Sequence, residues 1–126
     1  MTKDRNSIIM WASWAKDSFP IVQYLVENHN VDLSRRNRNG CSVAHWAASG
    51  GNLAVCKYLY EKGVDFDVVN HAGNSPLCHA VAYGREEVVF WLNNVVGASQ
   101  EAKELATKFA TWMDGDESRK QVLNLF

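Results

Sequence analysis

The sequence predicts an all-α protein, a stack of about four helix-turn-helix units joined by projecting hairpin-like connections, each termed a finger. Three observations predict this fold class. A pattern recurs every 33 residues, the apolar residues within it follow helical spacing, and the alternation typical of strands is hard to find. The 126 residues, 47% of them hydrophobic and only two of them proline, suffice for one modest domain of short helices.

The repeat is clearest when Gly40 is aligned with Gly73. Five further identities follow from this alignment: Ser42 with Ser75, Ala47 with Ala80, Gly51 with Gly84, Val55 with Val88 and Leu59 with Leu92. Most of the recurring positions are apolar, as expected where each unit buries one face against its neighbours. Residues 38–70 and 71–98 are therefore predicted to be two regular units.

Each regular unit is expected to hold two short helices. In the first unit, apolar residues keep helical spacing over residues 44–48 and 53–60, and Gly50-Gly51 marks the stop between the two stretches. Ser42 and Ser75 stand where N-cap residues are wanted. The connecting segment ends in Asn and Gly residues typical of a tight turn, which predicts the finger.

The two ends of the chain are atypical units. Residues 1–37 read as a degenerate N-terminal repeat, in which residues 8–15 form a first helix with no finger before it. Ser99 opens an apolar helical face, so residues 99–126 are predicted to be a C-terminal capping helix pair. Terminal units of a repeat stack need such wettable outer faces.

The segments that open the two regular units resemble the ankyrin repeat, which carries Thr-Pro-Leu-His-x-Ala at a 33-residue period. The first copy keeps the family's His as His45 but has Ser42 and Val43 in place of Thr and Pro. The second copy keeps the Pro and Leu but has Cys78 in place of His. The resemblance covers most of the chain and is strongest over residues 39–97.

This resemblance implies an ankyrin-repeat stack, an elongated and curved α-solenoid whose first helices line a concave face beside the fingers. It implies that the protein binds another protein through that face and the finger tips, and that it is not an enzyme. It also implies that His45 hydrogen-bonds within its turn and stabilises the transition from finger to helix.

Charge and cysteine content narrow the classes of function. The 13 basic and 14 acidic residues give a net charge of −1, which provides no overall field to attract nucleic acid or an anionic membrane. The apolar runs fall far below the roughly 20 residues needed to cross a bilayer, so we expect no membrane insertion. Three cysteines in no recognisable spacing argue for an intracellular, reducing compartment, cytoplasm or nucleus.

We expect no metal site, no cofactor and no catalytic site. Cysteines and histidines do gather around the fingers, but the spacing Cys41-x-x-x-His45 matches no zinc-ligand pair, and the repeat already explains His45 and Cys78 as turn positions. A cysteine nucleophile would also need an acidic residue to orient its histidine and a glycine-rich oxyanion loop, and the sequence offers neither nearby.

The positions that packing leaves free form the predicted partner-binding site. Trp46 occupies the variable position between His45 and Ala47, and Trp, Tyr and Arg are enriched at the energetic centres of interfaces. The alternative is that Trp46 packs against a neighbouring first helix, near Trp11, Trp14, His79 or Tyr83. The full predicted set is Trp46, Ser49, His79, Tyr83, Arg36, Arg38, Cys41, His71 and Asn74.

The leading hypothesis is a noncatalytic protein-interaction module or adaptor subunit of a larger complex. The basic run Arg35-Arg36-Asn37-Arg38 favours an acidic protein partner. The alternative is an RNA-contacting subunit of a ribonucleoprotein assembly that uses this arginine finger and nearby aromatic stacking. A third is a recognition domain of a longer protein. An outward-pointing Trp46 predicts that Trp46→Ala weakens partner capture without lowering the melting temperature.

Overall fold

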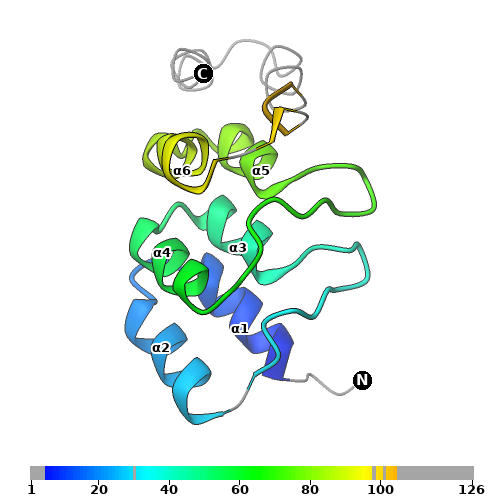
Figure 1. Ribbon diagram of the computed structural model, residues 1–126. Helices are drawn as coiled ribbons and strands as arrows, with labels where there is room; N and C mark the ends of the chain where they lie inside the picture. The colour runs from blue at the N-terminus through cyan, green and yellow to red at the C-terminus, as the bar shows by residue number, and fades with distance from the viewer. Residues whose placement is uncertain (1–4, 30, 98, 101, 105–126) are drawn as a thin grey trace.

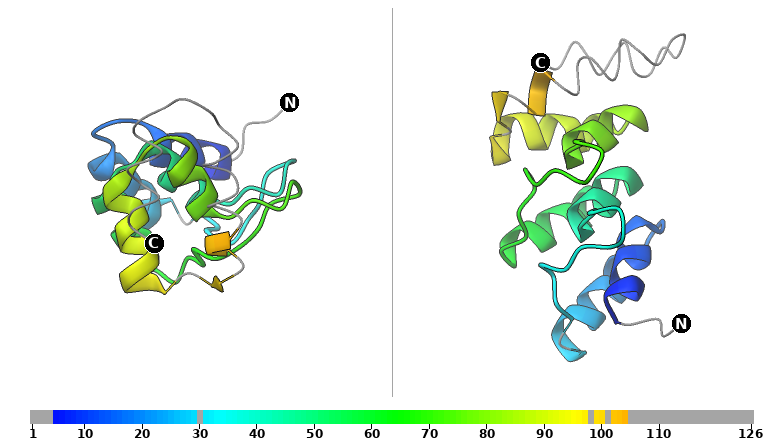
Figure 2. Two further views of the ribbon diagram at one scale, coloured as in Figure 1. Left: turned by 90° about the horizontal axis from the view of Figure 1, so that it is seen from above. Right: turned by 90° about the vertical axis from the view of Figure 1, so that its right-hand side faces the viewer.

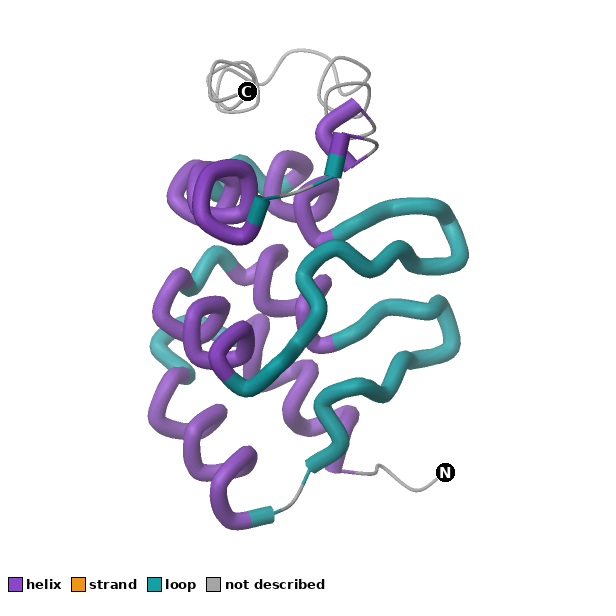
Figure 3. Tube along the Cα trace, in the orientation of Figure 1, coloured by secondary structure: helices purple, strands orange, loops and turns teal. Residues whose placement is uncertain are grey.

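The computed structural model describes residues 5–29, 31–97, 99–100 and 102–104, and the elements formed by these residues are helical (Figures 1 and 3). The helices are α1 (Arg5–Trp14), α2 (Phe19–Asn28), α3 (Val43–Gly50), α4 (Leu53–Glu61), α5 (Pro76–Ala82) and α6 (Glu86–Trp91), followed by a short π-helix, η1 (Leu92–Val96). No strand occurs in this part of the chain, which confirms the predicted all-α class.

The helices form two rows that stack along one direction. The first helices of the units lie side by side, α1 against α3 and α3 against α5, while α2, α4 and α6 form a second row on the side away from the fingers. The two fingers project together from the side of the first row, as the view from above shows (left panel of Figure 2). This arrangement is the predicted stack of helix pairs.

The predicted capping residues set the helix boundaries in the regular units. The Ser42 hydroxyl accepts the backbone N–H of Ala44 at 3.1 Å, and the Ser75 hydroxyl accepts that of Cys78 at 3.4 Å. Each satisfies a backbone donor that has no partner within its own helix. α3 ends where Gly51 takes a left-handed conformation with φ of +73°, which a side chain would disfavour.

The repeat interval extends into the hydrogen bonds of the fingers. The side-chain oxygen of Asn37 accepts the backbone N–H groups two and four residues further along, and Asn70, 33 residues later, does the same. Gly40 and Gly73 sit in equivalent left-handed conformations, with φ of +78° and +83°. The two fingers are therefore built by the same local interactions.

The core runs the length of the stack between the two rows. Small residues such as Ala44, Ala47 and Ala80 are fully buried in the first row, which lets neighbouring helices approach closely. In the second row, the buried ring of Trp91 packs edge-on against Tyr60 and Phe66 of the preceding unit, with centroids 5.5 and 5.3 Å apart. Aromatic side chains thus bridge consecutive units.

Beyond η1, the Ser99 hydroxyl accepts the backbone N–H of Ala102 at 3.2 Å, so Ser99 opens a helical turn as predicted. The remainder of the predicted C-terminal capping pair lies outside the described residues. Within the described part of the chain, none of the helices combines the length and apolar character required to span a bilayer.

Candidate partner-binding groove

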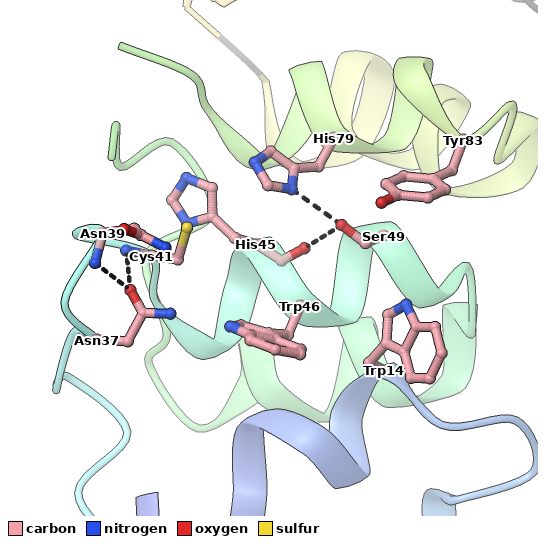
Figure 4. A pocket seen from close by; sticks show the side chains of 9 residues that line it. All are labelled: Trp14, Asn37, Asn39, Cys41, His45, Trp46, Ser49, His79 and Tyr83. Carbon is pink, nitrogen blue, oxygen red and sulfur yellow. Dashed lines mark hydrogen bonds between the residues drawn. The ribbon is translucent and has the colours of Figure 1, made fainter. Parts of the chain in front are cut away.

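A groove of about 180 Å³ lies over α3 on the finger side of the first-helix row (Figure 4). It draws side chains from three successive units and from the first finger. Its lining residues are Trp14, Asn37, Asn39, Cys41, His45, Trp46, Ser49, His79 and Tyr83. We refer to this candidate site below as the partner-binding groove.

Aromatic side chains form the outer walls of this groove. Trp14, the last residue of α1, is 45% exposed, and Tyr83, the first residue after α5, is 58% exposed. Trp46 of α3 is half-buried and packs against the core. The packing alternative for Trp46 therefore holds in part, since this side chain contacts the core and also lines the groove, and its role in partner binding stays a prediction. A substitution at the exposed Tyr83 therefore tests partner binding with less effect on packing than a substitution at Trp46.

The base of the groove is a chain of hydrogen bonds between the second and third units. The Ser49 hydroxyl donates to the carbonyl of His45 at 2.9 Å, and its oxygen accepts Nδ1–H of His79, also at 2.9 Å. Nε2 of His79 then accepts from the side-chain amide of Asn70 at 3.4 Å, and the same amide donates to the sulfur of Cys41 at 3.4 Å. Burial lowers the pKa of His79, so the histidine at the bottom of the groove is uncharged at neutral pH.

His45 has the structural role that the ankyrin resemblance implies. Its ring is fully buried, Nδ1 accepts the backbone N–H of Ser42 at 3.1 Å, and Nε2–H donates to the carbonyl of Asn74 at 2.9 Å. Burial lowers the pKa of His45 to about 4, because the charged form would lose water without gaining an acidic partner. The ring of His79 contacts it edge-on at 5.0 Å between centroids.

The groove brings together five of the nine residues predicted for partner binding, namely Cys41, Trp46, Ser49, His79 and Tyr83. Ser49 is buried, and its hydroxyl is engaged in the base of the groove rather than offered to a partner. Both nitrogens of His79 are likewise engaged.

The other four predicted residues lie outside the groove. Arg36 donates to the carbonyl of Val69 at 3.1 Å and so ties the first finger to the second. The Asn74 carbonyl accepts from His45, which gives Asn74 a structural role within the second finger. Arg38 and His71 are exposed on the fingers, where they remain available to a partner.

Sequence reasoning missed two residues of this region and left a third, the free finger position Asn39, out of the predicted set. Asn37 and Asn39 line the groove, and Asn70 connects Cys41 to His79. The 33-residue spacing of Asn37 and Asn70 was a usable signal, since both are finger residues at the same repeat position. Trp14 was considered only as a packing neighbour, although it forms a wall of the groove.

A cation stands at one rim of the groove. The Nε–H of Arg85 donates to the carbonyl of Ser49 at 2.8 Å, at the C-terminal end of α3, where a positive charge complements the helix dipole. The same guanidinium lies 5.9 Å from the centroid of the Tyr83 ring. Among the described residues that line the groove there is no carboxylate. In the described part of the molecule, no group of three His, Cys, Asp or Glu side chains is placed to hold a metal ion.

The sequence of this chain is similar to those of known ankyrin repeat proteins. An ankyrin repeat protein of Rickettsia bellii is 26% identical over 69 residues, covering 55% of this chain and 38% of that protein. An ankyrin repeat protein of Acanthamoeba polyphaga mimivirus is 32% identical over 92 residues, covering 73% and 13% respectively. This chain thus spans less than two fifths of either relative.

A solved structure shows the same fold. One chain in the complex of a predatory endopeptidase from Bdellovibrio bacteriovorus with an immunity protein matches with a TM-score of 0.64 and 24% identity, covering 95% of this chain and 63% of that chain. A family model of ankyrin repeats, in three copies, matches residues 9–104. That match covers both regular units and most of the N-terminal helix pair that precedes them. The chain therefore belongs to the ankyrin-repeat family.

Proposed function

We propose that this chain is a noncatalytic protein-interaction module that binds its partner in the partner-binding groove and along the finger tips. Ankyrin repeats are generally protein-protein interaction modules, and the family is generally noncatalytic. The observation that carries the proposal is the convergence of Trp14, Trp46 and Tyr83, from three successive units, on one groove open to solvent.

The exposed aromatic surface supplies the driving force for binding. Trp11, 61% exposed, lies one helical turn before Trp14 on α1, so both rings fall on the same side of the helix. A half-exposed aromatic side chain keeps on the order of 100 Å² in water, and covering it is worth roughly 2 kcal/mol. Covering three or four such side chains is enough for specific recognition once the costs of association are met.

Charge at the fingers favours an acidic partner. Arg38 is exposed between Asn37 and Asn39, which both line the groove, so a bound carboxylate can reach its guanidinium. The RNA-contacting alternative has no comparable support, because Arg36 is directed to a finger carbonyl and the chain as a whole is nearly neutral.

We further infer that the protein acts in a reducing compartment, as a subunit of a larger assembly or as a recognition domain. Cys41, Cys56 and Cys78 are all free thiols, which a reducing compartment preserves. An adaptor subunit must bind a partner, so the crosslinking experiment described next is also the first test of this assignment.

The test places a photo-crosslinking amino acid at position 83 and, as a matched control, at position 90. Phe90 is 54% exposed but lies on α6 of the second row, away from the groove. The crosslinked protein is identified by mass spectrometry, and its affinity is then measured for wild type, Tyr83→Ala, Trp14→Ala and Phe90→Ala.

We expect a crosslinked protein from position 83 but not from position 90. Tyr83→Ala and Trp14→Ala should each weaken binding about tenfold or more, as hot-spot truncations do, while Phe90→Ala leaves it unchanged. Equal crosslinking from both positions, or affinities within twofold of wild type for both groove variants, would contradict the proposal.

A further inference from the structure

Within the partner-binding groove, one small residue is surrounded by large aromatic side chains (Figure 4). Ser49 lies one helical turn after Trp46 on α3. Trp14 lies against the end of the same helix, since a Cβ atom on Gly50 would come within 2.5 Å of the Trp14 carbonyl oxygen. Tyr83, the residue that follows α5, reaches the site from the next unit. In that unit Ala82 occupies the repeat position of Ser49. Three aromatic walls therefore enclose a notch above a serine.

The volume of the groove limits which chemical group can occupy it; we call that group the guest. Pockets that enclose a whole small-molecule ligand measure about 300–1,000 Å³. The entire partner-binding groove measures about 180 Å³, which is room for one or two side chains. A guest of this size is an anchor belonging to a larger molecule rather than a free metabolite.

The base of the notch offers a guest almost no hydrogen bonds. The Ser49 hydroxyl already donates to the His45 carbonyl and accepts from His79, and the second nitrogen of His79 is already paired with Asn70. A polar or charged group seated on this base would lose its water without a replacement partner from Ser49 or His79, which costs free energy. An uncharged apolar side chain loses nothing and gains contact with the aromatic walls.

The charges around the notch define what flanks the guest. The guanidinium of Arg85 lies beside the Tyr83 ring, and Arg38 is exposed at the finger end of the groove. No carboxylate is among the lining residues to hold a cation. The surroundings therefore repel a lysine or trimethyllysine guest and attract carboxylates on either side of an apolar one.

We propose that this notch is an anchor site for one bulky apolar side chain, of leucine or phenylalanine size, carried by an acidic protein segment. The proposal rests on the proposed function and specifies the chemistry of the partner. The apolar side chain enters between Trp14, Trp46 and Tyr83, and its flanking carboxylates face Arg38 and Arg85.

The experiment titrates the full chain with capped seven-residue peptides while two-dimensional NMR follows the backbone amide and tryptophan indole signals. The probe peptide has one central phenylalanine flanked by aspartates. In the first comparison peptide alanine replaces the phenylalanine, in the second lysines replace the aspartates, and in the third a trimethyllysine replaces the phenylalanine.

We expect the probe peptide to shift the indole signals of Trp14 and Trp46 and the amide signal of Ser49, with saturation in the millimolar range or below. Each comparison peptide should bind at least fivefold more weakly. Tyr83→Ala should weaken binding of the probe peptide at least fivefold and Arg38→Gln about threefold, while Phe90→Ala, outside the groove, should change it less than twofold. A melting curve for each variant verifies that it folds.

Equal or tighter binding of the alanine, lysine or trimethyllysine peptide would overturn the anchor proposal, and so would the absence of any shift at millimolar probe. If such a result accompanies a partner crosslinked at position 83, the anchor chemistry is wrong and the interaction module stands. If position 83 captures no partner either, both proposals fail.

Discussion

His45 and Asn74 are joined by a hydrogen bond of 2.9 Å between the buried imidazole Nε2–H of one unit and a carbonyl in the finger of the next. The other ring nitrogen accepts the backbone N–H of Ser42, so one side chain fixes both the start of α3 and the position of the following finger. At the corresponding position of the next unit, the sulfur of Cys78 accepts from the Ser75 hydroxyl at 3.6 Å. The histidine is thus a clamp between consecutive units.

Replacing this clamp should destabilise the protein strongly. His45→Ala leaves the N–H of Ser42 and the carbonyl of Asn74 without their partner and opens a cavity, so we expect a loss of roughly 2–4 kcal/mol in the free energy of unfolding. Urea denaturation followed by circular dichroism measures it. Cys78→Ala is the matched control, since it removes a buried side chain that lacks this bond. A cost for His45→Ala no larger than that for Cys78→Ala would contradict the clamp.

The same burial predicts acid sensitivity. The pKa of His45 falls from 6.5 in the unfolded chain to about 4 in the folded protein, so between these values the unfolded state binds a proton that the folded state does not. Stability is therefore complete above about pH 6.5 and declines as the pH falls toward 4, by about 3 kcal/mol in total from this group. His79, whose pKa is also lowered by burial, acts in the same direction.

Urea midpoints measured at pH 7.5, 6.0 and 5.0 test this dependence. Carboxylates contribute little above pH 5, and the variant His45→Gln, which carries no titrating group there, supplies the reference slope. We expect wild type to lose more stability than the variant over this range. Parallel pH curves for the two proteins would show that His45 does not titrate as described.

The two finger glycines should differ in their tolerance of a side chain. Gly40 and Gly73 share a left-handed conformation, which costs an alanine about 1–2 kcal/mol. At Gly40 the added Cβ would also come within 2.6 Å of the His71 ring and 2.9 Å of the His71 backbone nitrogen, while at Gly73 it meets nothing within 4 Å. Gly40→Ala should therefore be the more destabilising by at least 1 kcal/mol in urea unfolding. Equal losses in the free energy of unfolding for the two variants would mean that the first finger shifts without cost to accommodate the added side chain.

The three thiols should react at very different rates in the folded protein. Cys41 is half-buried and lines the groove, whereas Cys56 and Cys78 are almost completely buried. Burial also raises the pKa of Cys56 to about 12, which suppresses its thiolate. Brief treatment with iodoacetamide at pH 8 should label Cys41 alone, as mass spectrometry of the digested protein would show. Labelling of Cys56 at a comparable rate would indicate that the core opens readily.

The architecture was predictable because the residues that start and end its helices and turns act locally and recur at a fixed interval. Ser42 and Ser75 cap helices, and Gly40 and Gly73 turn the chain, each through interactions with residues close in the sequence. A pattern of this kind needs no knowledge of the rest of the molecule. The resemblance to the ankyrin repeat then supplied the role of His45, whose decisive bond to Asn74 spans 29 residues.

The candidate site was predictable only in part, because it depends on contacts between units. Ser49 reads from the sequence as an outward position, but His79 in the next unit covers it and engages its hydroxyl. Arg36 reads as a free cation, but the second finger presents it with the carbonyl of Val69. Trp14 and Tyr83 are distant in sequence, and only the stacking of three units makes them walls of the same groove.

The shared origin of those walls has an evolutionary consequence. Repeat proteins gain and lose whole units without losing their fold, because each layer needs only its neighbours. In this chain the insertion of a single unit would extend the stack while separating the rings that meet above α3. Specificity here can therefore be rewritten by changing the number of layers, with no substitution at any residue that touches the partner.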